Sequence, residues 1–330
     1  MKISIKYVLG LLAAGFLALP IGCGDNSSSA PSMPVTGSGG VIGKDWFFTT
    51  ASASFSARDY QGSVVYNNKM WVIGGNDGAF KNDSWYSSDS VNWYQTPSSG
   101  ASFSPRSSFG MVVYNGKMWV IGGNAGGTNK NDVYSSTDGV VWSTVTAAAA
   151  FSPRQLHTTV VFNNLMWVIG GLTNAGVTND IWSSSDGITW TSATANAAFS
   201  PRQGHSSGVF NSFLWVIGGT GASGRMNDAF YSGDGTNWFQ ATANASFSAR
   251  DSQSTLVYSK SLWVIGGNTN AGVTNDIWSS PDGATWNNVT ASAPFSGRYG
   301  FSDVIYNNVM WVIGGMDGVI GRRNDVWETP

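Results

Sequence analysis

The sequence of 330 residues is poor in the side chains that enzymes use most often for catalysis. It contains one cysteine, Cys23, two histidines, His157 and His205, and one glutamate, Glu328. With a single cysteine no disulfide can form within the chain, so stability must come from core packing and hydrogen bonds. Only 11% of the residues are charged and the net charge is −2, which argues against nucleic acid as a partner.

Residues that favour helices are scarce as well, whereas residues that favour strands and turns are abundant. The chain has 16 Trp, 11 Tyr and 42 Gly, together with many Val, Ile and Thr. β-Branched and aromatic residues pack well on a pleated sheet, and glycine permits tight turns. This composition predicts an all-β protein.

The first 23 residues have the pattern of an export signal. Lys2 and Lys6 precede an apolar run over residues 7–19, which is shorter than the roughly 20 residues that a membrane-spanning helix needs. Residues 19–23, Leu-Pro-Ile-Gly-Cys, resemble a bacterial lipobox, although Pro20 stands where leucine is usual. We therefore predict a lipoprotein signal over residues 1–23 with lipidation at Cys23; an ordinary secretory signal is the alternative.

Residues 24–43 are rich in Ser, Gly and Pro and contain almost no large apolar side chains. Such a segment cannot bury enough surface to offset the entropy of ordering, so we expect a flexible tether. The folded domain is then expected over residues 44–330, held to the membrane only by the lipid anchor. The expected location is the cell envelope, facing the outer membrane or the periplasm, or otherwise the medium outside the cell.

The remaining chain is a repeat of 48 residues with one arginine, one Trp followed by a Gly-Gly pair, and one Asn-Asp pair in each copy. The arginines are Arg58, Arg106, Arg154, Arg202, Arg250 and Arg298. The Trp residues are Trp71, Trp119, Trp167, Trp215, Trp263 and Trp311. The Asn-Asp pairs begin at Asn82, Asn131, Asn179, Asn227, Asn275 and Asn324.

Four short strands can be read within each copy, separated by turn signals. Asn115-Gly116 and Asp138-Gly139 are strong signals for tight turns in the second copy. The four strands predicted there cover residues 111–114, 118–121, 132–135 and 140–142. Four antiparallel strands make one blade of a β-propeller.

The ends of the repeat indicate how the propeller closes. The sixth copy stops after its third strand, whereas Trp46 precedes Arg58 by the same interval that separates Trp142 from Arg154. Residues 45–50 should therefore supply the missing fourth strand, which would remove two exposed sheet edges. The sequence predicts a six-bladed propeller in which an N-terminal strand completes the last blade.

The Gly-Gly doublet after the second strand, the aromatic residue in the third and the Trp in the fourth resemble kelch repeats over residues 45–327. One departure is that the third-strand aromatic lies about one residue further from its Trp than is usual. The resemblance implies a kelch-type β-propeller and implies no particular activity.

The connections of such a blade divide between two faces of the propeller. The tight turns share one face, and we expect long loops after each Gly-Gly pair and between blades on the other. Loops on a rigid scaffold commonly carry binding sites, so the long-loop face is the candidate. The repeated arginines and the Asn-Asp aspartates most simply form buried ion pairs; the alternative is a ring of arginines that binds ligand, as in some kelch adaptors.

Residues that break the repeat are better candidates for function, because the scaffold does not require them. Three residues after each repeated arginine the chain varies among histidine, amide and aromatic side chains. Such side chains suit a sugar or a peptide, although they could simply fill the funnel. The ligand-binding candidates are Gln61, Phe109, His157, His205, Gln253 and Phe301, together with the non-repeated Arg225.

A second group of departures lies where the first and last blades should meet. Asp59, Asp77 and Asp317 are candidates for binding a hard cation through oxygen, with Asp303 and Arg322 nearby. No EF-hand-like spacing supports this site.

Three classes of function remain open. The leading one is a monomeric binding protein of the cell envelope that presents its loop face to a glycan or a protein and needs no cofactor. The second is an enzyme: sialic-acid mutarotases are kelch propellers, and resemblance to them implies a glutamate base, yet Glu328 lies on the closing strand. The third is a structural scaffold of the envelope.

Overall fold

A computed structural model describes residues 40–97 and 103–330 of the chain. These residues form strands and turns and contain no helix, which confirms the prediction of an all-β protein. Nowhere among them is there a helix long and apolar enough to span a membrane. The predicted signal, Cys23 and most of the predicted tether lie outside the described residues.

Each repeat forms four antiparallel strands, numbered here from the centre outward. The first strands are β2 (Gly62–Tyr66), β6 (Gly110–Tyr114), β11 (Thr158–Phe162), β15 (Ser206–Phe210), β20 (Ser254–Tyr258) and β25 (Ser302–Tyr306). The second strands are β3 (Lys69–Asn76), β7 (Lys117–Ala125), β12 (Leu165–Thr173), β16 (Phe213–Gly221), β21 (Ser261–Thr269) and β26 (Val309–Asp317).

The third and fourth strands complete each sheet. The third strands are β4 (Phe80–Ser87), β8 (Thr128–Ser136), β13 (Gly176–Ser184), β17 (Gly224–Ser232), β22 (Gly272–Ser280) and β27 (Arg322–Thr329). The fourth strands are β5 (Tyr94–Gln95), β9 (Ser143–Thr146), β14 (Thr191–Thr194), β18 (Phe239–Thr242), β23 (Asn287–Thr290) and, for repeat 6, β1 (Phe47–Thr50). Three short strands lie between repeats: β10 (Arg154–Gln155), β19 (Arg250–Asp251) and β24 (Arg298–Tyr299).

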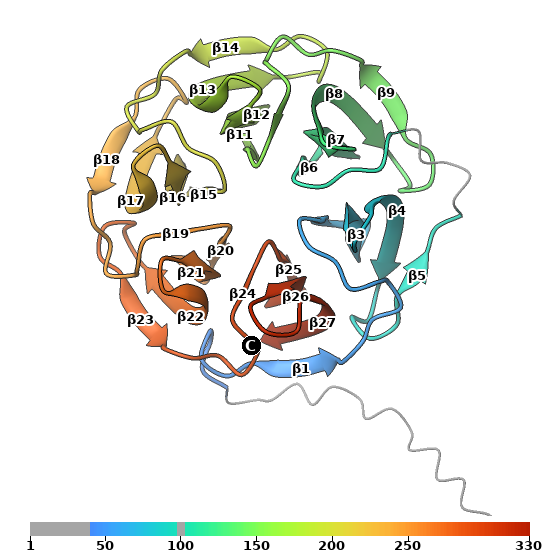
Figure 1. The fold of residues 1–330 in the computed structure, drawn as a ribbon, viewed down its shortest axis with the longest axis vertical. Helices are drawn as coiled ribbons and strands as arrows, with labels where there is room; N and C mark the ends of the chain where they lie inside the picture. Colours follow the sequence, from blue (N-terminus) through green and yellow to red (C-terminus); the bar gives the residue numbers. More distant parts are fainter. Residues whose placement is uncertain (1–39, 98–102) are drawn as a thin grey trace, which may run out of the picture. The chain divides into compact units, whose positions relative to one another are not determined.

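The sheets of the folded domain are arranged radially about a common centre (Figure 1). Strand β1 pairs antiparallel with β27, with Phe47 opposite Glu328 and Thr50 opposite Val326. The first and last parts of the repeat region therefore share one sheet, as the position of Trp46 predicts. Trp46 is buried and stacks edge-on against Phe295 at 5.2 Å between ring centroids.

The prediction of long loops after the Gly-Gly pairs is wrong. In repeat 2, β7 and β8 shift register between Ile121 and Gly123 and then continue to pair as far as Ala125 and Thr128. The glycines have φ of 59° and 99°, a conformation that glycine adopts without strain. The doublet therefore makes a β-bulge that bends the strands without ending them, and two-residue turns replace long loops in repeats 2–5.

Between repeats, a row of backbone hydrogen bonds runs around the centre. One residue in each inter-repeat loop has a left-handed φ between 50° and 59°. Its N–H donates to the carbonyl of the equivalent residue in the preceding repeat, and Tyr60 of repeat 1 donates to Gly300 of repeat 6. The residues are Tyr60, Ser108, Leu156, Gly204, Ser252 and Gly300; we call them the inner turn residues.

The six repeated arginines are structural, as the simpler of the two interpretations predicts. Each is 0–1% exposed and binds the aspartate of the Asn-Asp pair through two N–H groups. In repeat 3, Arg154 Nη1 donates to Asp180 Oδ1 at 2.7 Å and to the carbonyl of Gly170 at 2.9 Å. The guanidinium also lies 5.5 Å from the ring centroid of Phe151. Each arginine thus ties an inter-repeat loop to the Gly-Gly bulge and the third strand.

The chain joins the fold slightly before the predicted boundary at residue 44. Ile42 packs against the core between repeats 5 and 6, and the Gly43 N–H donates to Thr329 Oγ1 at 2.8 Å. The Nε1–H of Trp46 donates to the Gly43 carbonyl, as Trp190 does to Gly187 in the turn of repeat 3. Gly43 is therefore the turn glycine of repeat 6.

Removing β1 should destabilise the domain far more than removing the segment before it. Deletion of residues 1–50 exposes β27 and the core around Phe295, whereas deletion of residues 1–39 leaves every described contact in place. We expect the shorter protein to lose its cooperative thermal transition or to melt at a much lower temperature by circular dichroism. Equal melting temperatures for the two deletions would contradict the structural role of β1.

Breaking one buried arginine pair should also be costly. Arg154→Met leaves Asp180 without its partner, and loss of one member of a buried pair costs about 3–5 kcal/mol of unfolding free energy. The control is Arg225→Met, whose pair with Asp251 is partly exposed and should contribute about 1 kcal/mol or less. Urea unfolding measures both, and equal losses would show that burial is not decisive.

Candidate functional site

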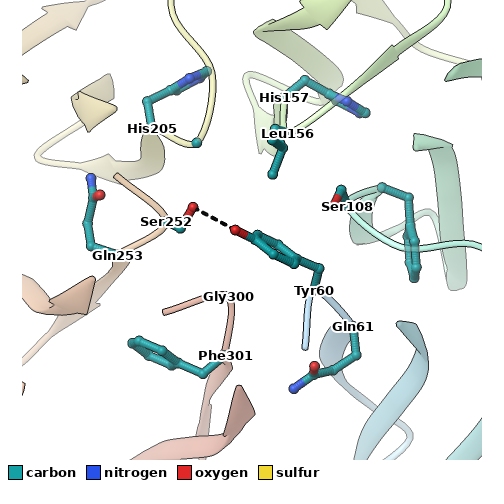
Figure 2. A pocket seen from close by; sticks show the side chains of 12 residues that line it. Tyr60, Gln61, Ser108, Leu156, His157, His205, Ser252, Gln253, Gly300 and Phe301 are labelled. Atoms are coloured by element: carbon teal, nitrogen blue, oxygen red, sulfur yellow. Dashed lines mark hydrogen bonds between the residues drawn. The ribbon is translucent and has the colours of Figure 1, made fainter. Parts of the chain in front are cut away.

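The structure brings six of the seven ligand-binding candidates together at the centre of the propeller. They lie next to the inner turn residues, one from each repeat, and are 4–9% exposed. They form a layer between two cavities and line both of them. The layer consists of Gln61, Phe109, His157, His205, Gln253 and Phe301, most of which Figure 2 labels.

The two glutamines of this layer are engaged with the neighbouring repeat. Gln61 Nε2 donates to the carbonyl of Ile313 at 2.9 Å, and Gln253 Nε2 donates to the carbonyl of Ile217 at 2.8 Å. Their amide nitrogens therefore bond across the boundary between repeats. Both glutamines also line the two cavities, so their role as ligand-binding residues stays a prediction.

Both histidines of the layer are buried and neutral. Burial, together with the charge of Arg154, lowers the pKa of His157 to about 3, and the Ile121 carbonyl and the charge of Asp180 oppose this only in part. Burial and the charge of Arg202 likewise lower the pKa of His205 to about 3. The His205 Nε2 atom lies 3.0 Å from the Thr158 hydroxyl oxygen. Both rings line the two cavities, but their lowered pKa makes them weak bases at neutral pH.

The first cavity, which we call the mouth cavity, opens on the face of the inter-repeat loops and has a volume of about 140 Å³. The inner turn residues surround it, and their side chains differ from repeat to repeat. Tyr60 extends across its centre, and its hydroxyl lies 3.2 Å from the Ser252 hydroxyl of repeat 5 (Figure 2). The ring of Tyr60 also stacks edge-on near Tyr299, at 6.1 Å between centroids.

Tyr60 is a site residue that the sequence analysis missed. Its φ of 50° is unusual for a tyrosine, and burial raises its pKa. The signal was present in the alignment of the repeats, because the same position holds Gly204 and Gly300. A repeat position that holds glycine in some copies indicates a left-handed backbone there. A tyrosine side chain at this position, close to the centre of the propeller, has little room except across the mouth.

Two ion pairs flank Tyr60 and Tyr299 at the rim of the mouth. Arg322 Nε donates to Asp59 Oδ1 at 3.1 Å, and Arg225 Nε donates to Asp251 Oδ2 at 2.6 Å. Burial raises the pKa of Asp59 despite the opposing effect of Arg322. Arg225, the seventh candidate, thus lies on the loop face but is paired with a carboxylate.

The structure does not gather the proposed metal ligands. Asp59 pairs with Arg322, Asp77 with Lys81, and Asp317 with Arg323 and three backbone N–H groups. No group of three or more histidine, cysteine or acidic side chains that could hold a metal occurs within residues 40–97 and 103–330.

Asp303 lies elsewhere than expected. From the sequence Asp303 is expected beside the loop aspartates, but it is the second residue of the innermost strand β25. There it lines the second cavity, which has a volume of about 250 Å³ and which we call the channel cavity. The pairing of β25 with β26 places Asp303 opposite Val312, away from the loop face.

Repeats 1 and 4 share an aromatic stack that the other repeats lack. Tyr86 lies 5.2 Å from Trp71 and 5.8 Å from Tyr94, and Tyr231 lies 5.3 Å from Trp215 and 5.7 Å from Phe239, between ring centroids. Tyr94 and Phe239 are 54% and 55% exposed on the outer strands. The corresponding cross-strand pairs are Ser135 with Ser143, Ser183 with Thr191, Ser279 with Asn287 and, in repeat 6, Glu328 with Phe47.

Repeated antiparallel sheets around a central cavity define the class of the molecule, a β-propeller. A family model described as the KLHDC2/KLHL20/DRC7 Kelch-repeats domain matches residues 45–194 and 184–329. The chain therefore belongs to the kelch-repeat family, as the Gly-Gly and Trp pattern predicts. No curated protein matches it in sequence.

The buried histidines predict a loss of stability in acid. A histidine whose folded pKa is about 3 binds protons in the unfolded state as pH falls below about 6.5, so unfolding becomes more favourable between those values. At pH 5 each histidine should cost ~2 kcal/mol relative to pH 8. His157→Gln/His205→Gln, the residue that repeats 1 and 5 carry at this position, should remove most of this difference in urea unfolding. An unchanged pH dependence would place the acid sensitivity elsewhere.

Proposed function

We propose that the chain is a six-bladed propeller, closed by β1, that serves as a protein-binding scaffold through the face carrying the mouth cavity. The closure is supported by the pairing of β1 with β27 and by the hydrogen bond from the Tyr60 N–H to the Gly300 carbonyl. The function rests on one observation: the inner turn residues share a backbone conformation but differ in side chain, and they surround the mouth. A scaffold alone does not require that difference.

The size of the mouth cavity favours a protein over a small molecule. Pockets that bury drug-sized ligands have volumes of about 300–1,000 Å³, whereas the mouth cavity has about 140 Å³. It accommodates a single side chain of a partner. Tyr60, Tyr299 and Leu156 supply an apolar centre, and the ion pairs of Asp59 and Asp251 supply a polar rim, the arrangement typical of protein interfaces.

The same geometry favours binding over catalysis. The two histidines in the cavity lining are neutral and buried, and Glu328 lies on β27 opposite Phe47. A mutarotase-like mechanism needs an effective acid or base that reaches a substrate from the mouth. The two histidines line the mouth but are weak bases because their pKa is lowered, and Glu328 does not line it. From the N-terminal sequence we also propose that the protein is a lipoprotein of the cell envelope, and we expect it to be a monomer.

A second candidate function, glycan binding, is favoured by the aromatic stacks of repeats 1 and 4. Sugar rings stack on flat aromatic faces, and Tyr94 and Phe239 are each more than half exposed. The same departure from the repeat occurs twice in one molecule, and two equivalent sites on one chain increase the avidity for a polymeric ligand.

The protein-binding proposal predicts that mouth variants lose partners. Tyr60→Ser/Leu156→Ser introduces the residue that repeats 2 and 5 carry, so the fold should be retained. We expect capture of partners from envelope extracts, quantified by mass spectrometry, to fall at least about tenfold, because aromatic residues dominate interface energies. The matched control, Lys117→Ser/Val141→Ser, changes the opposite face. If capture of partners is unchanged by the mouth substitutions, or falls equally with the control substitutions, the mouth face is not the binding surface.

The glycan proposal predicts binding that depends on the exposed aromatic residues. Tyr94→Ser/Phe239→Ser should abolish the signal of the protein on an array of glycans and cell-wall fragments, and each single change should weaken it by loss of avidity. Ile188→Ser, a substitution of another exposed apolar residue, is the control. Array binding that survives the double change would refute the aromatic stacks as the site.

A further inference from the structure

Of the side chains that line the channel cavity, one carries a charge, that of Asp303. The cavity is bordered by the second residue of each innermost strand, in addition to the layer of side chains above it. Five of these six residues are neutral, and four of the five carry a hydroxyl group. The six are Ser63, Met111, Thr159, Ser207, Thr255 and Asp303.

Asp303 has no cationic partner within the described ranges 40–97 and 103–330. The ten ion pairs found there involve other carboxylates, and the adjacent innermost strands β2 and β20 carry no charged side chain. Burial raises the pKa of Asp303 to about 7, and the Ser254 hydroxyl opposes this only in part. Every other aspartate with a raised or lowered pKa has an arginine, a lysine or backbone N–H groups against it.

We propose that the channel cavity binds a small protonated primary amine that also carries hydroxyl groups, with its ammonium group against the Asp303 carboxylate. An ammonium group has three N–H donors. The carboxylate accepts one or two of them in a charge-assisted bond, and the hydroxyl oxygens of neighbouring strands accept the rest. One carboxylate matches one positive charge.

The lining distinguishes this ligand from a metal ion. Calcium and magnesium are bound by several oxygen ligands that usually include more than one carboxylate, and here only Asp303 is acidic. The cavity of about 250 Å³ also far exceeds the ~10–15 Å³ of such space that a single water molecule needs. Phe109, Met111 and Phe301 offer contacts for carbon atoms, while Ser63, Thr159 and Ser207 offer hydrogen bonds for hydroxyl groups.

Amine affinity at Asp303 should decrease as the pH falls. The other titratable side chains that line the channel are His157 and His205, which stay neutral down to about pH 3. Behind β25, strand β26 carries only Asp317, which is paired with Arg323. Alkylamines remain protonated up to about pH 10, so affinity should fall as pH decreases through about 7 and Asp303 gains a proton.

Isothermal titration calorimetry of the purified protein with ethanolamine and glucamine tests the site, with ethylene glycol and sorbitol as neutral controls. We expect both amines to bind at pH 8, to bind at least about tenfold more weakly at pH 6, and the neutral compounds not to bind. Asp303→Asn should lower amine affinity at least about tenfold, the scale of a lost charge-assisted bond.

A second pair of variants, in which the carboxylate is moved to a neighbouring strand, distinguishes loss of the charge from damage to the fold. Asp303→Ser abolishes the charge, and adding Ser63→Asp restores it on the adjacent strand, so amine binding should be lost in the first variant and regained in the second. Failure of both amines to bind the wild type would overturn the proposal. So would equal affinity in Asp303→Asn, or equal binding of the neutral compounds. None of these outcomes depends on whether the mouth binds a protein.

Discussion

The buried pair between a repeated arginine and the aspartate of the Asn-Asp motif is the interaction on which the rest of the structure depends. The guanidinium of each arginine is almost fully buried. In repeat 2 it donates to the carboxylate of Asp132, to the carbonyl of Gly122 and to the carbonyl of Ser104, two residues before the arginine. A buried charge is tolerated only when all of its donors are satisfied. That requirement holds the inter-repeat loop, the bulge and the third strand in one geometry, six times over.

The position of the inner turn residues follows from that anchor. Each lies two residues after its arginine, and its left-handed backbone directs its N–H to the preceding repeat. The next side chain then lies over the first glycine of the preceding doublet, where a Cβ atom would come within about 3 Å of a backbone carbonyl. Glycine is therefore required at this position because the neighbouring backbone approaches so closely. The layer of Gln61, Phe109, His157 and their equivalents packs against these glycines and fills the boundary between repeats.

The residues that build the propeller differ from those at the proposed binding sites. The arginines, the aspartates and the second-strand Trp residues repeat without exception, and they are buried or partly buried. Three departures from the repeat carry the proposals: the mouth around Tyr60, the aromatic stacks of Tyr94 and Phe239, and the channel at Asp303. Each departs from a position that is small or polar in most of the other repeats, so the fold does not need the larger or charged side chain.

Much of the architecture follows from the sequence alone, because strand, turn and repeat are local patterns. The period of 48 residues, the type of each turn and the missing fourth strand of repeat 6 all predict the observed pairing, including that of β1 with β27. The sequence could not decide which way a side chain faces at the centre. Gln61 and His157 are predicted as ligand-binding residues; the structure shows that they line both cavities and also that they pack against the neighbouring repeat. Asp303 looks like a loop residue, and only strand register places it in the channel. The first outcome depends on contacts with the neighbouring repeat, such as the one between Gln253 and Ile217, and the second on the pairing of β25 with β26. The sequence pattern of a single strand contains neither.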